Sequence, residues 1–294
     1  MSGVDASGAS KPLVSIGVPV YNESKYIRSA LEALLRQSYS HIEVIVFDNA
    51  STDETWSICQ DMASADTRLR IYKNEKNVGA AENTRLVFRE AKGEYFMWAA
   101  GHDSWEKNYL EVAVNALEAR DSAVLCFGVN HWIDDDGEKL VRTSGWADTV
   151  GLGPCSRMVF ALLGSMNPIL GVIRRQAIED IPKLLGCIGW DLLVLAELSL
   201  RGEFINVTGA AWSRREFRHE PSYAEKLKRY KSKEFNLVDT WFYRHFPNAN
   251  ILIQLVFVIA RAKIPWLKKA VLLFSTPLIL LIKYIDFKLS ASAR

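Results

Sequence analysis

The stretch Val14-Ser15-Ile16-Gly17-Val18-Pro19-Val20-Tyr21-Asn22-Glu23 decides the fold. Its apolar part, Val14–Val20, predicts a buried strand, and Pro19 with the polar residues after it predicts a turn at the strand end. Ser24 is a residue type that caps helices, and residues 24–37 carry apolar side chains at helical spacing. The chain therefore begins its fold with a strand, a polar turn and an amphipathic helix.

The same alternation of short apolar runs and helical stretches continues to about residue 119. The expected strands are Val14–Val20, Val44–Phe47, Leu69–Tyr72 and Tyr95–Ala99, and the expected helices are Ser24–Gln37, Asp53–Ala63, Gly79–Ala91 and Lys107–Ala119. This alternation predicts an α/β fold with βαβ units and a mostly parallel sheet flanked by helices. Ligands bind beyond the carboxyl ends of such strands, so the loops after these strands are the expected site.

After residue 122 the regular alternation of expected strands and helices ends. A hairpin is expected, with Ala123–Trp132 and Lys139–Arg142 as strands and Asp134-Asp135-Asp136-Gly137 between them. The acidic triplet could bind a metal, but Asp and Gly are also the residues that a turn selects. Further expected elements are a strand at Asn167–Arg174 and helices at Gln176–Leu185, Trp190–Leu200 and Ser222–Phe246.

The composition of the chain indicates which binding partners and which cellular compartment to expect. The chain has 294 residues and a formal net charge of +2, which gives no reason to expect nucleic acid as a partner. The cysteines lie far apart and form no Cys-x-x-Cys pair, so free thiols in a reducing, cytoplasmic compartment are expected. Residues 1–11 are small and polar, which predicts a flexible tail and no signal peptide.

The last part of the chain, residues 223–294, is expected to be a helical extension. Its apolar runs, Ile251–Ala260 and Ala270–Ile282, flank a basic segment, and Pro277 interrupts the second run. Each run is shorter than the ~20 residues of a membrane-spanning helix. Two interpretations remain open. Residues 251–289 form helices in the interface of a membrane, as a peripheral protein at its cytoplasmic face, or they pack on the domain or on a second subunit.

Polar residues follow each of the first four expected strands. Tyr21 could stack on a base or fill a gap, and Asp48 follows a strand without an evident capping role. Gly79 opens a helix, whose N-terminus suits a phosphate. The last of these loops contains His102 and Asp103, which could bind an oxygen-rich ligand or a divalent ion, although a turn is the more usual role of such a pair.

The order and spacing of these loops resemble family 2 glycosyltransferases of the GT-A fold. The matching stretches are Val14–Glu23, Asp48-Asn49-Ala50-Ser51-Thr52-Asp53, Asn77-Val78-Gly79 with Asn83, and Gly93-Glu94-Tyr95. The resemblance is clear over residues 12–117 and looser to residue 222. It implies a nucleotide-sugar-binding half, residues 12–120, and an acceptor-binding and catalytic half, residues 121–222.

The resemblance also implies a set of residues that bind the nucleotide-sugar donor. Tyr21 and Asp48 would flank the base, with Pro19 and Glu23 shaping the same pocket. Asn77 and Asn83 would support the loop near the diphosphate, and a basic loop with Arg215 and Arg218 would close over it. UDP is the expected nucleotide on family frequency.

The sequence departs from the family at the Asp-x-Asp metal motif. Ala100, Gly101 and His102 occupy its positions, and Asp103 follows. His102, Asp103 and His219 are the candidate ligands of Mn²⁺ or Mg²⁺. In the alternative, little metal is needed and donors such as Arg214, Arg215 or Arg218 neutralise the diphosphate.

The resemblance points to Asp191 as the general base of an inverting transfer to a glycan or lipid-linked acceptor. Without the resemblance, Asp191 is a first-turn carboxylate stabilised by the helix dipole. Trp190 beside it could stack on the acceptor sugar. Two other classes stay open: a scaffold relative that lacks the usual acids, and a nucleotide-dependent oxidoreductase, although no Gly-x-Gly-x-x-Gly follows the first strand.

Overall fold

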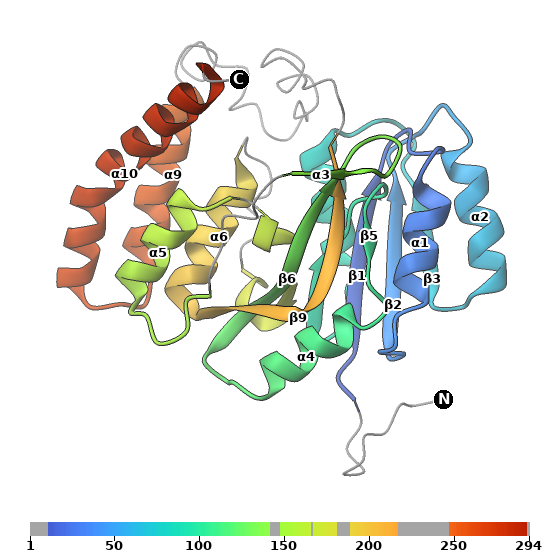
Figure 1. The fold of residues 1–294 in the computed structure, drawn as a ribbon, viewed down its shortest axis with the longest axis horizontal. Coiled ribbons are helices and arrows are strands. Elements are labelled where there is room, and N and C mark those ends of the chain that lie inside the picture. The colour runs from blue at the N-terminus through green and yellow to red at the C-terminus, as the bar shows by residue number, and fades with distance from the viewer. Residues whose placement is uncertain (1–10, 142–147, 166, 181–188, 217–246, 293–294) are drawn as a thin grey trace.

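A computed structural model describes residues 11–141, 148–165, 167–180, 189–216 and 247–292. One sheet runs through the centre of the molecule (Figure 1). Its strands are β1 (Val14–Val20), β2 (Ile42–Asp48), β3 (Leu69–Lys73), β4 (Tyr95–Trp98), β5 (Ser104–Trp105), β6 (Ala123–Ile133), β7 (Lys139–Leu140), β8 (Val172–Arg174) and β9 (Glu203–Arg215). The order is β3-β2-β1-β4-β8-β6-β9-β5, with β7 paired to β6.

The direction of the strands divides the sheet into two parts. β3, β2, β1 and β4 are parallel to one another, as the alternation of strands and helices predicts. β8 is antiparallel to both β4 and β6, and β5 and β7 also pair in antiparallel fashion, so the second part is mixed rather than parallel. β6 and β9 are parallel to each other, and β6 points the same way as β4. Consequently the carboxyl ends of both parts lie along one edge.

Helices cover both faces of the sheet. They are α1 (Ile27–Leu35), α2 (Thr55–Ala65), α3 (Ala80–Arg89), α4 (Tyr109–Glu118), α5 (Pro154–Leu163), α6 (Trp190–Arg201), α9 (Pro247–Arg261) and α10 (Trp266–Ser292). Figure 1 shows α1 and α2 beside the first strands, and α5, α6, α9 and α10 grouped at the other side of the molecule. The expected α/β class with a helical extension is confirmed.

The buried strands divide their side chains between two apolar cores. In β2, Val44 and Val46 belong to the core under α1, α2 and α4, whereas Ile45 and Phe47 belong to the core under α3, α5 and α6. Successive side chains of a strand point to opposite faces, so a strand covered on both faces must be apolar throughout. This explains why the first strands read as uninterrupted apolar runs in the sequence.

Two expected elements after residue 166 differ from the structure. The stretch expected to be a strand from Asn167 begins as a 3₁₀ helix, η1 (Asn167–Leu170), and only Val172–Arg174 pairs in the sheet. Pro168 has no N–H to donate, and its carbonyl accepts from Gly171, which closes a turn. The expected helix from Gln176 is a 3₁₀ turn, η2 (Arg175–Ala177). Residues 181–188 and the expected helix Ser222–Phe246 lie outside the described residues.

The C-terminal helices combine a buried face with an exposed one. α10 continues through Pro277, which was expected to interrupt it. Leu272 and Ile279 are buried in the core on either side of Pro277, and this packing holds the helix together across it. Phe274, by contrast, is 88% exposed. Among the residues that the structure describes, no helix is long and apolar enough to cross a membrane.

Candidate functional site

The loops that follow β1, β2 and β3 lie side by side because the three strands end in register. Val20 is opposite Asp48, and Asp48 is opposite Lys73. Pro19, one of the candidate donor residues, lies opposite Phe47 near the end of β1. The polar residues after these strands therefore meet at the carboxyl edge of the sheet, where parallel α/β sheets bind ligands.

The first two loops are joined by backbone-to-side-chain hydrogen bonds. Asn22 has a left-handed backbone (φ 56°), and its side-chain Oδ1 accepts from the Thr52 N–H at 2.9 Å. The Asn22 N–H donates to Ser51 Oγ at 2.9 Å, and the Glu23 N–H donates to Thr55 Oγ1 at 2.8 Å. These contacts leave Tyr21 at the rim of the edge, 45% exposed. An exposed ring at this point could stack on a base.

Asp53 holds the same two loops together. Its Oδ2 accepts from the Ser24 N–H at 3.1 Å, and its Oδ1 accepts from the Thr55 hydroxyl and N–H. Partial burial works against the charged carboxylate, but these hydrogen bonds outweigh it and lower the pKa of Asp53 to about 2. Ser24 was expected to cap the first helix. That helix begins at Ile27 instead, and Ser24 serves the loop contact.

Asp48 lies at the predicted edge, but its side chain is fully buried. Its carboxylate oxygens accept from the Ser51 N–H at 3.3 and 3.2 Å. This contact spans Ala50, whose backbone is left-handed (φ 59°). Asp48 therefore stabilises the turn of the second loop, a role that its place in the sequence did not show. Its contact with a base stays a prediction.

Four asparagines join the second loop, the third loop and α3. Asn49 Nδ2 donates to Asn77 Oδ1 at 3.0 Å, while Asn49 Oδ1 accepts from Asn74 Nδ2 at 3.1 Å. Asn74 Nδ2 also donates to Asn83 Oδ1 at 2.9 Å, and Asn83 Nδ2 donates to the Phe47 carbonyl at 2.8 Å. Asn77 and Asn83 thus join these loops, and their place near the donor diphosphate stays a prediction. Asn49 and Asn74 were missed, although asparagine after consecutive strands was a visible signal.

The fourth loop lies against the first. An added Cβ at Gly101 would come within 2.9 Å of Val20, so the close approach of this loop requires glycine. His102 Nδ1 lies 2.9 Å from Glu23 Oε1. Burial disfavours the charged imidazole, but the hydrogen bond to Glu23 and the nearby Asp103 outweigh it and raise the pKa of His102.

The donor atoms around His102 form only part of a metal site. When the Glu23 carboxylate accepts a hydrogen bond from Nδ1–H, Nε2 is the nitrogen that could hold a metal. Asp103 is 3% exposed, and its Oδ1 already accepts from the Arg215 N–H at 2.9 Å. The described part of the chain contains no group of three or more His, Cys, Asp or Glu placed to hold a metal ion. The third candidate, His219, lies outside the described residues.

The acidic triplet after β6 forms a turn. Asp134 Oδ1 accepts from the Asp136 N–H at 2.9 Å and from the Glu138 N–H at 3.0 Å. Gly137, with φ at 91°, completes the hairpin between β6 and β7. The turn interpretation is therefore the one that the structure supports.

Arg214 and Arg215 differ sharply in their surroundings. The Arg215 guanidinium lies 4.3 Å from the Tyr26 ring centre and donates to the carbonyls of Asp134 and His102. These contacts tie Arg215 to three loops, so its expected contact with the donor stays a prediction. Arg214 points to the other side of β9. Arg218 lies outside the described residues.

Asp191 lies in the first turn of α6, two residues after Gly189, which precedes the helix and has a left-handed backbone (φ 77°). Its Oδ1 accepts from the Leu192 N–H at 2.9 Å. Burial raises the pKa of Asp191, and the Leu192 N–H, Arg214 and Lys283 oppose this effect. A carboxylate with a raised pKa is suited to proton transfer.

The side chain of Trp190 packs against the sheet. Its ring lies edge-on to Trp98 of β4, with 5.4 Å between the ring centres. Trp190 is also one of the partly buried side chains against the core. This packing fixes the start of α6, and the suggested stacking of Trp190 on an acceptor sugar stays a prediction.

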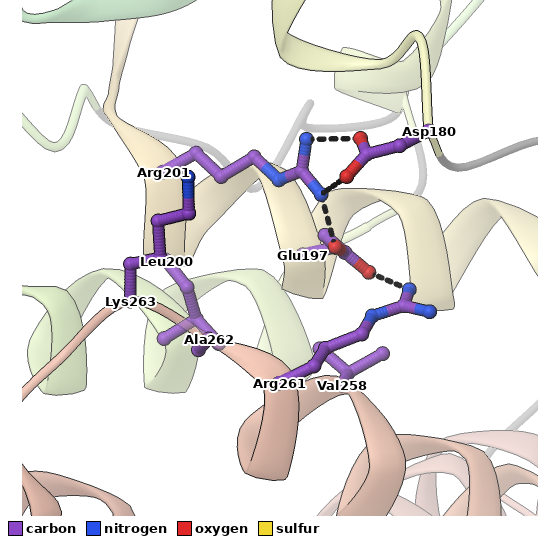
Figure 2. Close-up of a pocket in the computed structure, with 8 residues that line it drawn as sticks. All are labelled: Asp180, Glu197, Leu200, Arg201, Val258, Arg261, Ala262 and Lys263. Carbon is purple, nitrogen blue, oxygen red and sulfur yellow. Dashed lines mark hydrogen bonds and ion pairs between the residues drawn. The ribbon is translucent and has the colours of Figure 1, made fainter.

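A cavity of about 370 Å³ lies between α6 and α9. Figure 2 shows Glu197 between Arg201, which also binds Asp180, and Arg261. Arg201 is the last residue of α6, whereas Asp191 is in its first turn. The cavity is therefore at the far end of this helix from the candidate base. Four of its charged side chains are paired with one another: Asp180, Glu197, Arg201 and Arg261.

Comparison with known proteins identifies the family. Residues 15–181 match the family described as glycosyl transferase family 2, which is more than half of the chain. The chain belongs to this family. Among its relatives is glycosyltransferase GlyG of Streptococcus pneumoniae serotype 4, 32% identical over 133 residues. That alignment covers 45% of this chain and 44% of GlyG, so the chain spans under half of this relative.

Solved structures show the same fold. S. aureus TarS, in complex with UDP-GlcNAc, superposes with a TM-score of 0.66 at 17% identity, over 93% of this chain and 73% of TarS. The mannosyltransferase PcManGT of Pyrobaculum calidifontis, in complex with GDP-Man and Mn²⁺, gives a TM-score of 0.54 at 19% identity, over 95% and 84% of the two chains. The GT-A fold is confirmed.

Proposed function

We propose that this enzyme transfers a sugar from a nucleoside diphosphate donor, UDP being the nucleotide, to a glycan or lipid-linked acceptor with inversion. The observation that carries the proposal is the carboxyl edge of the sheet. There, the loops with Tyr21, Glu23 and Asp48 lie at the edge where β4 ends at Trp98, and Trp98 packs against Trp190, the first residue of α6, which Asp191 follows. The loops with Tyr21, Glu23 and Asp48 suit a nucleotide, and the start of α6 provides Asp191, a carboxylate with a raised pKa.

In the proposed reaction Asp191 is the general base. It takes the proton from the acceptor hydroxyl while the acceptor oxygen bonds to the anomeric carbon. The bond between that carbon and the diphosphate oxygen breaks, and the nucleoside diphosphate leaves with the electron pair. A positioned base contributes roughly 10²–10⁴-fold to such a step. The positive charges of Arg214 and Lys283 act on Asp191 and oppose the rise of its pKa.

The choice of UDP rests on its frequency in the family and on a likeness of fold. TarS was solved with UDP-GlcNAc, whereas PcManGT was solved with GDP-Man. In this chain, Tyr21 is the exposed ring at the base-binding end, and Asn77 and Asn83 hold the loop next to it. The donor sugar, and the contacts of Arg215 and Arg218 with the diphosphate, belong to the same proposal.

A divalent ion, Mn²⁺ or Mg²⁺, is part of the proposal. His102 through Nε2 and Asp103 are the residues that would hold it, with His219 as a further candidate. When bound, the ion would neutralise charge on the leaving diphosphate. PcManGT was solved with Mn²⁺, which supports this expectation without testing it.

Contact with a membrane through residues 251–289 is also proposed. α9 and α10 expose many large apolar side chains: Ile253, Val256, Phe257, Trp266, Leu267, Val271, Leu273, Phe274, Leu278, Leu281, Ile282, Tyr284 and Ile285. Residues 247–292 carry six Lys or Arg and one acidic residue, Asp286. Apolar exposure with a basic rim suits an anionic lipid surface, and the reducing side of a membrane suits the free thiols of Cys59, Cys126 and Cys155.

The proposal is tested by calorimetric titration of UDP, GDP, dTDP and NAD into the purified enzyme, followed by assay of the matching nucleotide-sugars. We expect UDP to bind more tightly than the other nucleotides, and UDP to be released from a UDP-sugar when an acceptor is present. If GDP or dTDP binds and UDP does not, the donor carries that nucleotide instead of UDP. Binding of none of the diphosphates, or no turnover with any donor, would favour a scaffold relative.

A further inference from the structure

The Asp191 carboxylate depends on its own helix for its position. Trp190, the residue before it, lies edge-on to Trp98 and fixes the sheet side of the first turn of α6. The hydrogen bond that Asp191 accepts from the Leu192 N–H lies within α6 itself. The carboxylate therefore follows the position of this turn, and residues that hold the turn also hold the carboxylate.

The C-terminal helix α9 contacts the residue that precedes α6. Gly189 has a left-handed backbone (φ 77°), a conformation that favours glycine. A Cβ added to Gly189 would lie 3.1 Å from Ile251 Cδ1 and 3.5 Å from Ile251 Cγ1, so the Ile251 side chain rests directly on this part of the backbone. Ile251 is partly buried and packs against the core that includes Leu192 and Leu193. It thus contacts the chain two residues before Asp191.

The other C-terminal helix, α10, contacts the end of α5. Lys283 Nζ donates to the Leu162 carbonyl at 2.7 Å and to the Gly164 carbonyl at 3.0 Å. A cation that binds the last carbonyls of a helix stabilises its C-terminus. α5 packs against α6, and the positive charge of Lys283 acts on Asp191. Lys283 therefore joins α10 to the surroundings of the candidate base.

α9 also contacts α6 toward its other end. Glu197 is 4% exposed and binds both Arg201 of α6 and Arg261, the last residue of α9 (Figure 2). Loss of one partner would leave a buried carboxylate incompletely paired, which is costly. α9 thus passes along α6, with Ile251 at the start of α6 and Arg261 toward its end. These two contacts restrain α6 against a shift along its axis and against a tilt.

Membrane contact alone does not account for this arrangement. The side chains proposed to meet lipid are exposed, whereas Leu255, Val258 and Leu272 are buried in the same core as Leu192 and Leu195. α9 and α10 therefore have a second face, which packs toward α6. All three helices lie outside residues 15–181, the range that matches the family.

We propose that the C-terminal helices position the catalytic base, with Ile251 of α9 and Lys283 of α10 as positioning residues that fix the first turn of α6. In this way they place the Asp191 carboxylate for the acceptor hydroxyl. A misplacement of about 1 Å can cost roughly 10²-fold in rate. The inference rests on the proposed function, in which Asp191 is the general base. It gives residues 247–292 a part in catalysis besides the proposed contact with lipid.

Replacement of Ile251 by Ala tests the contact with Gly189, because it removes both of the Ile251 atoms that lie closest to Gly189. We expect the transfer rate at saturating donor and acceptor to fall about 10-fold or more, while UDP affinity stays within about 2-fold of wild type. Ile251→Val removes Cδ1 alone and should lose less rate, about 3-fold. The Val variant carries the test if the Ala variant does not fold.

Lys283 provides an independent pair of variants, measured at a pH above the acidic limb of activity. Lys283→Met loses the charge and the contacts with the carbonyls of Leu162 and Gly164, so the transfer rate should fall while UDP affinity is kept. Lys283→Arg restores a cation that can donate to the same carbonyls, so it should recover much of the rate. A purely structural role would not lower the transfer rate of folded enzyme while sparing UDP affinity.

A core truncation away from α6 separates positioning from a general loss of stability. Leu117, near the end of α4, is fully buried in the other core, so Leu117→Ala should lower the melting temperature at least as much as Ile251→Ala. We expect Leu117→Ala to keep the transfer rate of folded enzyme.

Two results would overturn the inference and leave the proposed function intact. One is an equal loss of transfer rate in Leu117→Ala, and the other is an unchanged rate in the Ile251 variants and in Lys283→Met. Transfer by Asp191→Asn at the wild-type rate would instead overturn the proposed function itself.

Discussion

Glu23 and His102 join the first and fourth loops of the sheet edge, with His102 Nδ1 2.9 Å from Glu23 Oε1. They lie 79 positions apart in the chain. Because Glu23 accepts from Nδ1, the imidazole presents Nε2 toward Asp103, at 3.9 Å from its Oδ1. This orientation gives the altered metal motif a defined donor atom, and it leads to the first prediction.

Chelation should suppress transfer, and Mn²⁺ or Mg²⁺ should restore it. We expect His102→Ala to need a higher Mn²⁺ concentration for half-maximal activity, because an imidazole ligand is lost. The measurement is transfer rate against Mn²⁺ concentration after EDTA treatment. His41→Ala is the control, since His41 contacts the Lys11 carbonyl at the opposite end of β2. Full activity after chelation would favour neutralisation of the diphosphate by arginine.

Replacement of Asn83 by Leu should weaken both the fold and the donor loops. Asn83 is 2% exposed and links the Phe47 carbonyl to Asn74. Leaving these groups unpaired should lower the free energy of unfolding by about 1–3 kcal/mol, measured by urea denaturation. UDP affinity should fall with it. Asn115→Ala, on the exposed face of α4, should change stability by less than about 0.5 kcal/mol. An equally small effect of Asn83→Leu would contradict the loop-linking role.

The pH dependence of transfer should have an acidic limb set by Asp191. Burial raises the pKa of Asp191, and a base must be unprotonated, so activity should be present above this pKa and lost as pH falls through it. The limb should therefore lie above the range of an ordinary aspartate, about 4. Lys283 opposes the shift, so Lys283→Met should move the limb to higher pH. Lys107→Met, at an exposed position, should leave it in place. If Lys283→Met leaves the limb in place, the acidic limb does not report the titration of Asp191.

Binding to anionic vesicles should depend on the exposed face of α10. Trp266 and Phe274 are 77% and 88% exposed, so Trp266→Glu with Phe274→Glu should abolish flotation with liposomes while leaving the core intact. Val141→Glu is the matched control, because Val141 is a fully exposed apolar residue away from this face. Flotation of the double variant at the wild-type level would contradict membrane contact through α10. A change of oligomeric state in its place would favour packing against a second subunit.

The sequence predicts the first four strands well because each is buried on both faces and must be apolar. It also predicts that the loops after these strands meet at one edge, as the register of β1, β2 and β3 shows. It does not predict that Ser24 serves a contact with Asp53, since that hydrogen bond joins residues 29 positions apart. Local rules govern caps, whereas the register of neighbouring strands decides which loop residues meet.

The part of the chain that contains β9 and α10 was harder to predict from its sequence, because tertiary contacts override local rules there. Pro277 breaks helices by local rules, yet α10 continues through it because side chains on either side are packed in the core. Arg214 and Arg215 are adjacent and chemically identical in the sequence. Their opposite directions follow from the alternation of β9, and their different partners follow from tertiary contacts with Asn167 and Asp134.

The central claim is that Asp191 takes the acceptor proton at a site that binds the donor independently of it. The most direct measurement is the transfer rate of Asp191→Asn, with UDP affinity measured on the same sample. Asparagine keeps the shape and can still accept from the Leu192 N–H, but it cannot serve as a base. We predict a loss of roughly 10²-fold or more in transfer rate with UDP affinity within about 2-fold of wild type. Transfer at a rate close to wild type would show that Asp191 is not the base.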